Sequence, residues 1–370
     1  MSAANDIFTS QLLRAVSTKY CQLVSESEKK TMSRNDLLSK KIVDEKLARL
    51  KRKCSQLTKI VVRDDEDTTM MTYFTLSHFE RLTGIHLFRC PPSAIRDFFD
   101  LRSQLITIKM FYSGIGKLYT IFLPMYGSHK KLQYFLSSSS AAAASITSVE
   151  QFFSTLRPEL GMEYSNVTDS NDFNPRSLSN NVASLFSMFN WSLVTSLTLT
   201  HCGLTSLDLS LHFFPAVEYI NLSHNYLKKI AHLQNCTRLK SLNLSHNRIE
   251  SLLSFHLTLG NIATLNIANN KINSLEGIDR LLSLERVDAR NNCISKYHDV
   301  RYLALLPCLE VIYLENNPLP KSIPPFHYSY RTQFYYELLT QHNYATSTRT
   351  LPTLDGINMS ADERAALRYF

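Results

Sequence analysis

One pattern, LxxLxLxxNxL, occurs six times between Val194 and Leu319 and constrains the fold more than any other feature of the chain. The central segments of the six copies read SLTLTHCGL, YINLSHNYL, SLNLSHNRI, TLNIANNKI, RVDARNNCI and VIYLENNPL. Their ninth positions follow one another at steps of 23, 22, 23, 22 and 25 residues. A period of this length is typical of a solenoid, in which each copy forms one coil and neighbouring coils share a core.

The residue types at each position of the repeat indicate how the coils stack. Positions four, six and eleven are apolar, as with Ile220, Leu222 and Leu227, and are expected to point inward. The ninth residue lies where the strand turns, and an asparagine amide there can satisfy backbone groups of adjacent coils that would otherwise be buried unpaired. Cys202 occupies this position in the first copy. We therefore predict a structural asparagine ladder made of Asn225, Asn247, Asn270, Asn292 and Asn317.

This is the pattern of leucine-rich repeats. It predicts an α/β leucine-rich-repeat solenoid with short repeats of 22–23 residues, a helical N-terminal arm and a C-terminal cap. Coils this short leave room between strands only for a turn, a 3₁₀ segment or a short helix. We expect five regions in the 370 residues: a basic helical arm over 1–75, degenerate leucine-rich repeats over 76–124, a partly disordered insertion over 125–190, six clear repeats over 191–320 and a cap over 321–370.

Local signals support these boundaries. Segments 82–90 and 105–115 fit the repeat template weakly, whereas 137–145 reads SSSSAAAAS and lacks residues that could form a core. Residues 33–60 carry an uneven apolar stripe that predicts a helix. Near the other end, Ser360 and Glu363 form a capping-box pattern at the start of a helix.

The positive charge is concentrated at the beginning of the chain. The formal net charge is +8, and residues 1–63 hold 14 Lys and Arg against six Asp and Glu, so the remainder is neutral. Two interpretations of the segment remain open. It caps the N-terminal edge of the solenoid or stays a solvated helix, or it binds nucleic acid, an anionic membrane or an acidic partner.

The sequence offers little for catalysis, and we expect neither an enzyme nor a cofactor. It contains no Walker A loop, GxSxG elbow, HExxH motif or protein-kinase signature. Its seven cysteines are scattered and form no zinc-like spacing. His201, His224 and His246 occupy the eighth position of successive repeats, but no carboxylate or cysteine accompanies them, so we predict no metal site.

The strand face offers a candidate protein-binding site. Positions three, five, seven and eight are expected to face outward from the strands. Large aromatic and charged residues gather toward the last two repeats, and Tyr and Arg supply much of the binding energy in protein interfaces. The candidates are Tyr219, Arg286, Asp288, Arg290, Tyr313 and Glu315.

The chain also resembles a known family. Trp191 followed by LTSLDLSL, FPAVEYINLSHN and successive tight repeats is similar to the repeat region of the serine/threonine-protein kinase 11-interacting protein family, and the nischarin group shares this repeat type. The similarity extends from about Phe79 to Asn317. This resemblance implies a cytoplasmic scaffold without activity of its own, and it supplies no catalytic residues.

Two functions follow as hypotheses. In the first, the chain is an intracellular scaffold or adaptor in signalling that presents its concave face to a protein partner such as a serine/threonine kinase or an endomembrane complex. In the second, it is an RNA-associated protein that uses its basic arm on phosphates. We expect a cytoplasmic location, because the first residues lack a secretory signal and the cysteines suggest no disulfide framework.

Overall fold

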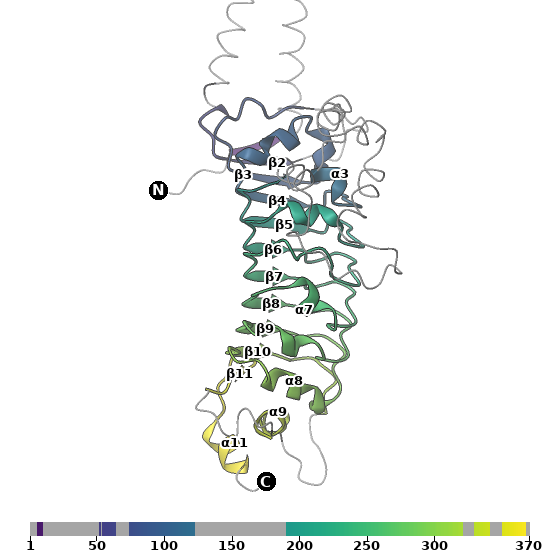
Figure 1. Ribbon diagram of the computed structural model, residues 1–370, viewed down its shortest axis with the longest axis vertical. Coiled ribbons are helices and arrows are strands. Elements are labelled where there is room, and N and C mark those ends of the chain that lie inside the picture. Colours follow the sequence, from purple (N-terminus) through teal and green to yellow (C-terminus); the bar gives the residue numbers. More distant parts are fainter. Residues whose placement is uncertain are drawn as a thin grey trace, which may run out of the picture. The chain divides into compact units, whose positions relative to one another are not determined.

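The computed structural model describes residues 6–9, 52, 54–63, 74–122, 190–320, 329–340 and 350–367. Figure 1 shows the helices and strands of these residues. The described residues fall into two compact units. Unit 1 comprises the described residues up to Cys202, and unit 2 those from Gly203 onward. The predicted insertion over 125–190, apart from Asn190, and most of the helix predicted over 33–60 lie outside the described residues.

Unit 1 is built on a sheet of parallel strands in sequence order. The strands are β1 (Asp6–Thr9), β2 (Lys59–Arg63), β3 (Gly84–Phe88), β4 (Thr107–Phe111) and β5 (Ser196–Thr200). Strands β3 and β4 lie in the two degenerate repeats, and their alternating inward residues are buried.

Strands β1 and β2 correct the expectation of a helical arm over 1–75. The segment KIVVR forms a strand rather than the end of a helix, although Arg52 and Cys54 just before it are helical. The physical reason is its run of β-branched residues, which suits a pleated surface. Pairing with β3 buries Ile60 and Val62 almost completely, at 1% and 0% exposure.

The opposite side of unit 1 closes on the only tryptophan of the chain. This side carries η1 (Pro92–Ala94), η2 (Phe98–Ser103) and α3 (Tyr119–Phe122). Trp191 is fully buried, packs 5.4 Å from the rings of both Phe98 and Phe122, and donates a hydrogen bond from Nε1 to the Phe122 carbonyl at 3.4 Å. The chain therefore returns at Trp191 to the place it leaves after Phe122, and β4 pairs directly with β5.

Unit 2 continues the same design with shorter strands, all parallel to their neighbours. The strands are β6 (Tyr219–Asn221), β7 (Ser241–Asn243), β8 (Thr264–Asn266), β9 (Arg286–Asp288), β10 (Val311–Tyr313) and β11 (Thr353–Leu354). The predicted inward positions four, six and eleven are buried in each of the five repeats that contain β6 to β10; Ile220, Leu222 and Leu227 have exposures of 2% or less.

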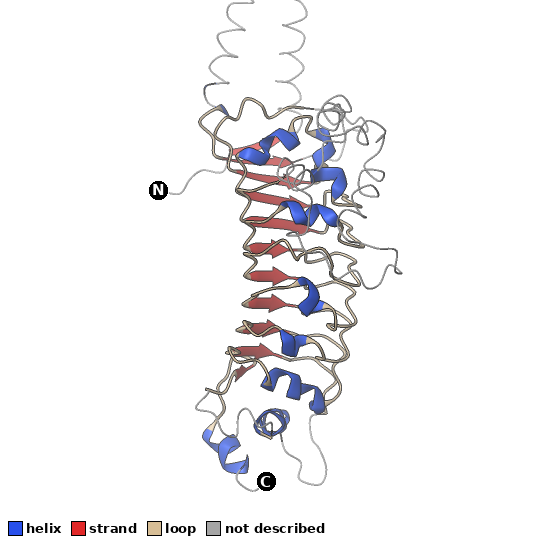
Figure 2. Cartoon of the chain, viewed as in Figure 1, coloured by secondary structure: helices blue, strands red, loops and turns tan. Residues whose placement is uncertain are grey.

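The connections between the strands of unit 2 are as compact as the repeat length predicts. Figure 2 shows them on the side of the coils opposite the strands. They contain η5 (Leu209–Phe213), α7 (Phe255–Thr258), η6 (Ile278–Arg280), η7 (Tyr297–Val300) and α8 (Arg301–Ala304).

The end of unit 2 contains two further helices, α9 (Tyr330–Leu339) and α11 (Ala361–Ala366). The capping box expected at Ser360 and Glu363 is present, with both reciprocal hydrogen bonds. Arg331 of α9 donates to the Glu363 carboxylate and to the Leu354 carbonyl, each at 2.7 Å. Strand β11 was not predicted, and it pairs with the outer edge of β10.

Candidate functional site

The ninth-position asparagines hold the coils of unit 2 together. Asn270 accepts a hydrogen bond from the Ile249 N–H at 3.0 Å and donates from Nδ2 to the carbonyls of Leu244 and Ile267, each at 3.0 Å. The same acceptor bond, to the eleventh-position N–H of the preceding coil, occurs in all five residues: Asn225, Asn247, Asn270, Asn292 and Asn317. These side chains thereby satisfy backbone groups where the strands end.

The eighth position of each coil has a left-handed backbone, which explains the histidines found there. The φ angles are 55° to 60° at His201, His224, His246, Asn269, Asn291 and Asn316. Asn and His tolerate this conformation better than most residues do. In unit 2 the rings of His224 and His246 stack with centroids 4.0 Å apart, while in unit 1 His201 stacks on Tyr112 at 4.4 Å.

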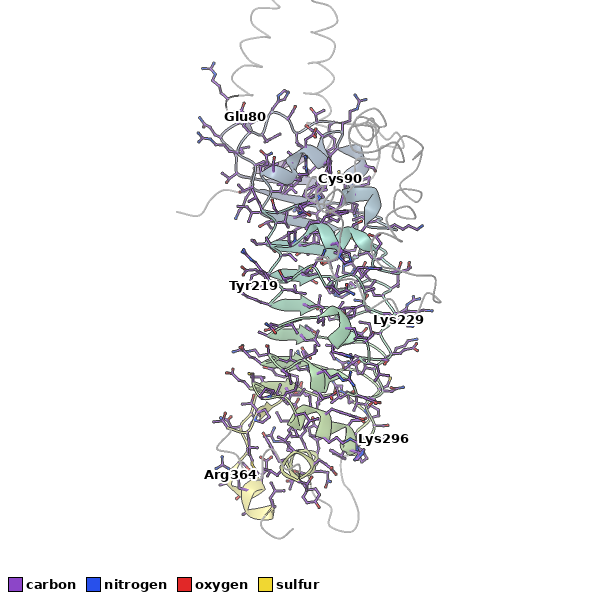
Figure 3. All side chains as sticks on the ribbon, viewed as in Figure 1. Glu80, Cys90, Tyr219, Lys229, Lys296 and Arg364 are labelled. Atoms are coloured by element: carbon purple, nitrogen blue, oxygen red, sulfur yellow. The ribbon has the colours of Figure 1, made fainter. Side chains whose placement is uncertain are left out.

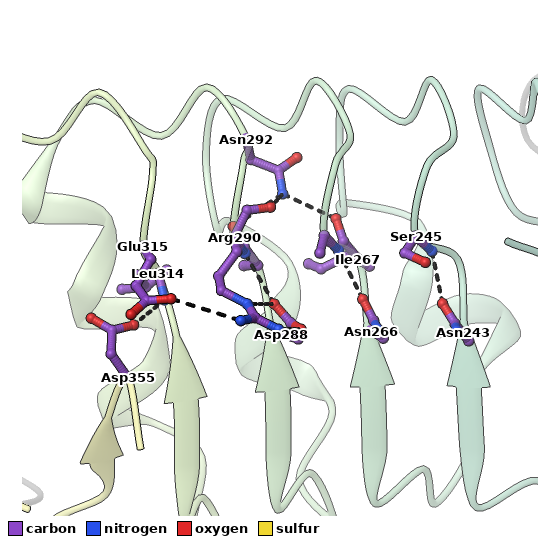
Figure 4. Close-up of polar contacts among 12 residues, drawn as sticks. Asn243, Ser245, Asn266, Ile267, Asp288, Arg290, Asn292, Leu314, Glu315 and Asp355 are labelled. Carbon is purple, nitrogen blue, oxygen red and sulfur yellow. Dashed lines mark hydrogen bonds and ion pairs between the residues drawn. The ribbon is translucent and has the colours of Figure 1, made fainter. Parts of the chain in front are cut away.

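The fifth position performs a structural task that sequence reasoning missed. The side-chain oxygen of Asn243 accepts a hydrogen bond from the Ser245 N–H at 2.9 Å, and Asn266 bonds the Ala268 N–H in the same way at 3.0 Å (Figure 4). This is an Asx turn, in which an Asn or Asp side chain bonds the backbone two residues later. The signal was present in the sequence as a run of Asn and Asp at one repeat position.

The expectation that the seventh position faces outward is wrong in four repeats. Thr200, Ser223, Ser245 and Ala268 have exposures of 5% to 8%. Thr200 is the last residue of β5, and the other three lie just beyond the ends of their strands; in all four repeats the side chain is packed into the coil. In the last two repeats the position holds the larger Arg290 and Glu315, whose side chains are 40% and 50% exposed.

Arg290 connects four of the predicted binding residues with one another. Its guanidinium donates from Nε and Nη2 to the two carboxylate oxygens of Asp288, at 3.0 and 2.7 Å, and pairs with Glu315 at 3.7 Å (Figure 4). It also lies over the ring of Tyr313, 5.0 Å from the centroid. The hydrogen bond to Asp288 raises the pKa of Arg290 further above its usual range. We call Asp288, Arg290, Tyr313 and Glu315 the Arg290 cluster.

The Asp288 carboxylate serves the fold as well as this cluster. Its Oδ1 also accepts the Arg290 backbone N–H at 3.2 Å, the same Asx contact that Asn243 and Asn266 make in their repeats. The carboxylate is therefore held in place before any partner arrives. Its side chain is 16% exposed.

The two remaining predicted residues lie on the strand face outside the cluster. Arg286 and Tyr219 occupy the third positions of β9 and β6, and both are exposed, Tyr219 at 53%. Strands β7 and β8 separate β6 from β9, so Tyr219 lies about 14 Å from Arg286 at ordinary strand spacing. Figure 3 shows Tyr219 on the opposite side of unit 2 from Lys229 and Lys296.

Two further findings concern the chemistry of the described residues. Within these ranges no group of three or more His, Cys, Asp and Glu side chains is arranged to hold a metal ion. In the same part of the chain, no helix combines the length and apolarity needed to cross a membrane.

Known proteins share this repeat region. The family model described as Leucine rich repeat matches residues 192–249. Human serine/threonine-protein kinase 11-interacting protein is 30% identical over 130 residues, which cover 35% of this chain and 12% of that protein. A leucine-rich repeat-containing protein from Schizosaccharomyces pombe is 30% identical over 141 residues, covering 37% of this chain and 23% of the other.

Among solved structures, internalin C2 from Listeria monocytogenes has a TM-score of 0.37 and 15% identity, over 71% of this chain and 83% of that one. The matches to the two curated relatives span less than a quarter of either protein's length. The parallel strands, the buried leucine positions and the family match agree on the repeat type. The described repeats have the leucine-rich-repeat solenoid fold, and the repeat region resembles that of serine/threonine-protein kinase 11-interacting protein.

Proposed function

We propose that the chain is a non-enzymatic scaffold that binds a protein partner through the strand face of unit 2. The observation that carries the proposal is the Arg290 cluster, in which a cation, two carboxylates and an aromatic ring form one connected group. Leucine-rich-repeat solenoids present extended surfaces of this kind to other proteins.

The cluster suits a protein partner because its geometry is set in advance. Asp288 and Arg290 hold each other, so little side-chain freedom remains to be lost at this point when a partner binds. Glu315 within the cluster and Arg286 beside it are both exposed and offer charges of both signs. Tyr219 provides a second aromatic anchor farther along the face.

The identity of the partner is a further step of the proposal. The human relative is named for its interaction with a serine/threonine-protein kinase. By analogy we propose a kinase or a kinase-associated signalling complex in the cytoplasm as the partner here. The alternative of an RNA-associated protein draws no support from the Arg290 cluster, which contains two carboxylates.

The experiment is affinity purification with quantitative mass spectrometry from the native cell. The test variant Arg286→Ala/Tyr313→Ala/Glu315→Ala keeps the structural pair of Asp288 and Arg290. The control variant Arg280→Ala/Tyr302→Ala/Glu276→Ala removes the same residue types from the helical side of unit 2.

The proposal expects a partner that co-purifies with the wild type and with the control variant but is depleted with the test variant. Equal recovery from all three chains would refute binding at the cluster. A partner that shows kinase activity in the purified material would support the finer assignment, and a partner without any kinase association would refute it.

A further inference from the structure

A second surface is the outer face of strands β2 to β5 in unit 1, and the charged side chains of these four strands are all positive. The register of β2, β3 and β4 aligns Arg63 with Phe88 and Phe111, and it aligns His86 with Lys109. The four strands β2 to β5 read KIVVR, GIHLF, TIKMF and SLTLT, without an acidic residue among them. The strand face of unit 2, in contrast, carries Asp288 and Glu315.

One row of this surface is a ladder of stacked planar groups. The rings of Phe88 and Phe111 stack with centroids 4.6 Å apart and an angle of 16° between their planes. The guanidinium of Arg63 lies over Phe88, 5.3 Å from its centroid. Both phenylalanines are only partly buried. Phe88 lies between Arg63 and Phe111, so both of its faces are covered and its edge is the part of the ring left for solvent.

In the other rows, Lys59 and Lys109 lie on the strands on either side of His86. An added Cβ at Gly84 would lie 3.0 Å from Cγ of Lys59, so the lysine stem lies across the glycine rather than pointing away from the sheet. Burial lowers the pKa of His86, and the positive charges of Lys109 and Lys59 lower it further. The histidine therefore senses a positive field from both neighbouring strands.

We propose that this surface binds an acidic, extended peptide segment of a protein partner. Carboxylates complement the cations of Lys59, Arg63 and Lys109, and the electropositive edges of the two phenylalanine rings favour them as well. Apolar side chains of the same peptide can pack between the carboxylates against the rings. This site lies in unit 1 and does not depend on the function proposed for the Arg290 cluster.

The ring geometry favours a peptide over a single-stranded nucleic acid. Proteins that bind single strands offer open aromatic faces on which bases stack. Here Arg63 covers one face of Phe88 and Phe111 covers the other, so no base can stack on Phe88. The chain itself contains four acidic residues directly after Arg63, at positions 64 to 67, and the test must separate them from a partner.

The test measures fluorescence anisotropy of labelled probes with the full chain at low salt. The probes are a peptide of three Glu-Ser-Leu-Ser units, in which Glu and Leu alternate along one face of an extended chain, the same peptide with Gln in place of Glu, and an oligothymidylate of equal residue number. The test variant is Lys59→Glu/Lys109→Glu, with Lys59→Gln/Lys109→Gln as a milder version. The control is Lys229→Glu/Lys296→Glu, which makes the same charge change at exposed lysines of unit 2.

We expect the acidic peptide to bind the wild type and the Lys59→Glu/Lys109→Glu variant to weaken this binding about tenfold or more, since each reversal replaces an attraction by a repulsion. The glutamine-substituted variant should show a smaller loss in the same direction, and the control should stay within about twofold of the wild type. Thermal unfolding of each variant confirms that it is folded.

Several results would overturn the proposal. If the test and control variants lost affinity for the acidic peptide equally, net charge alone would explain the effect. Tight binding of the Gln peptide would show that carboxylates are not required. Tighter binding of the oligothymidylate than of the acidic peptide would assign the surface to nucleic acid. Binding that occurs only after residues 64 to 67 are neutralised would assign it to the chain's own acidic segment.

Discussion

Replacing Asn270 by alanine tests the asparagine ladder at a residue that makes the full set of four hydrogen bonds. The Ile249 N–H donates to the Asn270 side chain, and leaving such a buried donor unsatisfied costs about 1–3 kcal/mol. The carbonyls of Leu244 and Ile267 also lose the hydrogen bond from Asn270, but each still accepts one from a neighbouring asparagine, Asn247 or Asn292. Losing these two bonds therefore costs less than leaving the N–H unsatisfied. Together these effects give an expected destabilisation of about 3 kcal/mol.

The assay is urea-induced unfolding followed by circular dichroism, with the free energy obtained by linear extrapolation. Asn273→Ala is the matched control, because this exposed asparagine is three residues away in the same repeat, and we expect a change within about 0.5 kcal/mol. If Asn270→Ala changed the free energy of unfolding as little as Asn273→Ala does, the ladder would not hold the coils together as described.

Two further predictions concern the turns and the C-terminal helices. Gly277 has a φ of 96°, and an added Cβ would lie 2.7 Å from the Leu252 carbonyl oxygen, so Gly277→Ala should cost about 2 kcal/mol. Thermal unfolding of both variants checks this prediction, because Gly260→Ala, at a site with open space, should leave the melting temperature unchanged. Equal melting temperatures of the two variants would contradict the clash at Gly277. Burial acts to raise the pKa of Glu363, but its bonds to Arg331 and to the Ser360 N–H hold the pKa below its ordinary value. The folded state therefore gains stability from the charged carboxylate above the unfolded-state pKa of about 4.3, and this gain is lost as the pH falls through the lower folded-state pKa. The melting-temperature difference between wild type and Glu363→Gln should be larger at pH 7 than at pH 3, and a difference independent of pH would contradict the ion pair.

The repeat pattern predicted most of the architecture because its apolar positions and its asparagine position each have one physical task. A leucine at position four or six can only face the core, and the spacing then determines strand order and the length of the connections. The Ser360 and Glu363 pair predicted the start of α11 equally well, since the capping box depends on neighbouring residues alone.

Other features depend on contacts that no local pattern encodes. Strand β2 forms because β3 offers it an edge, and the helical stripe predicted over 33–60 obscured its β-branched run. Strand β11 has only two residues and is held by β10 and by Asp355, which bonds the Leu314 N–H. At the candidate site, the residue types in and after β9 and β10 indicated the Arg290 cluster. The hydrogen bond from the Arg290 N–H to Asp288 depends on the turn after β9, which the residue types did not reveal.

Site-specific photo-crosslinking in the native cell tests the central claim most directly. A benzophenone amino acid is placed at Arg286, on the strand face beside the Arg290 cluster, and at Lys229 on the opposite side of unit 2 as the control. The account predicts a discrete crosslinked protein from the Arg286 position that is absent from the Lys229 position. Crosslinks from Lys229 alone, or the same product from both positions, would contradict binding through this face.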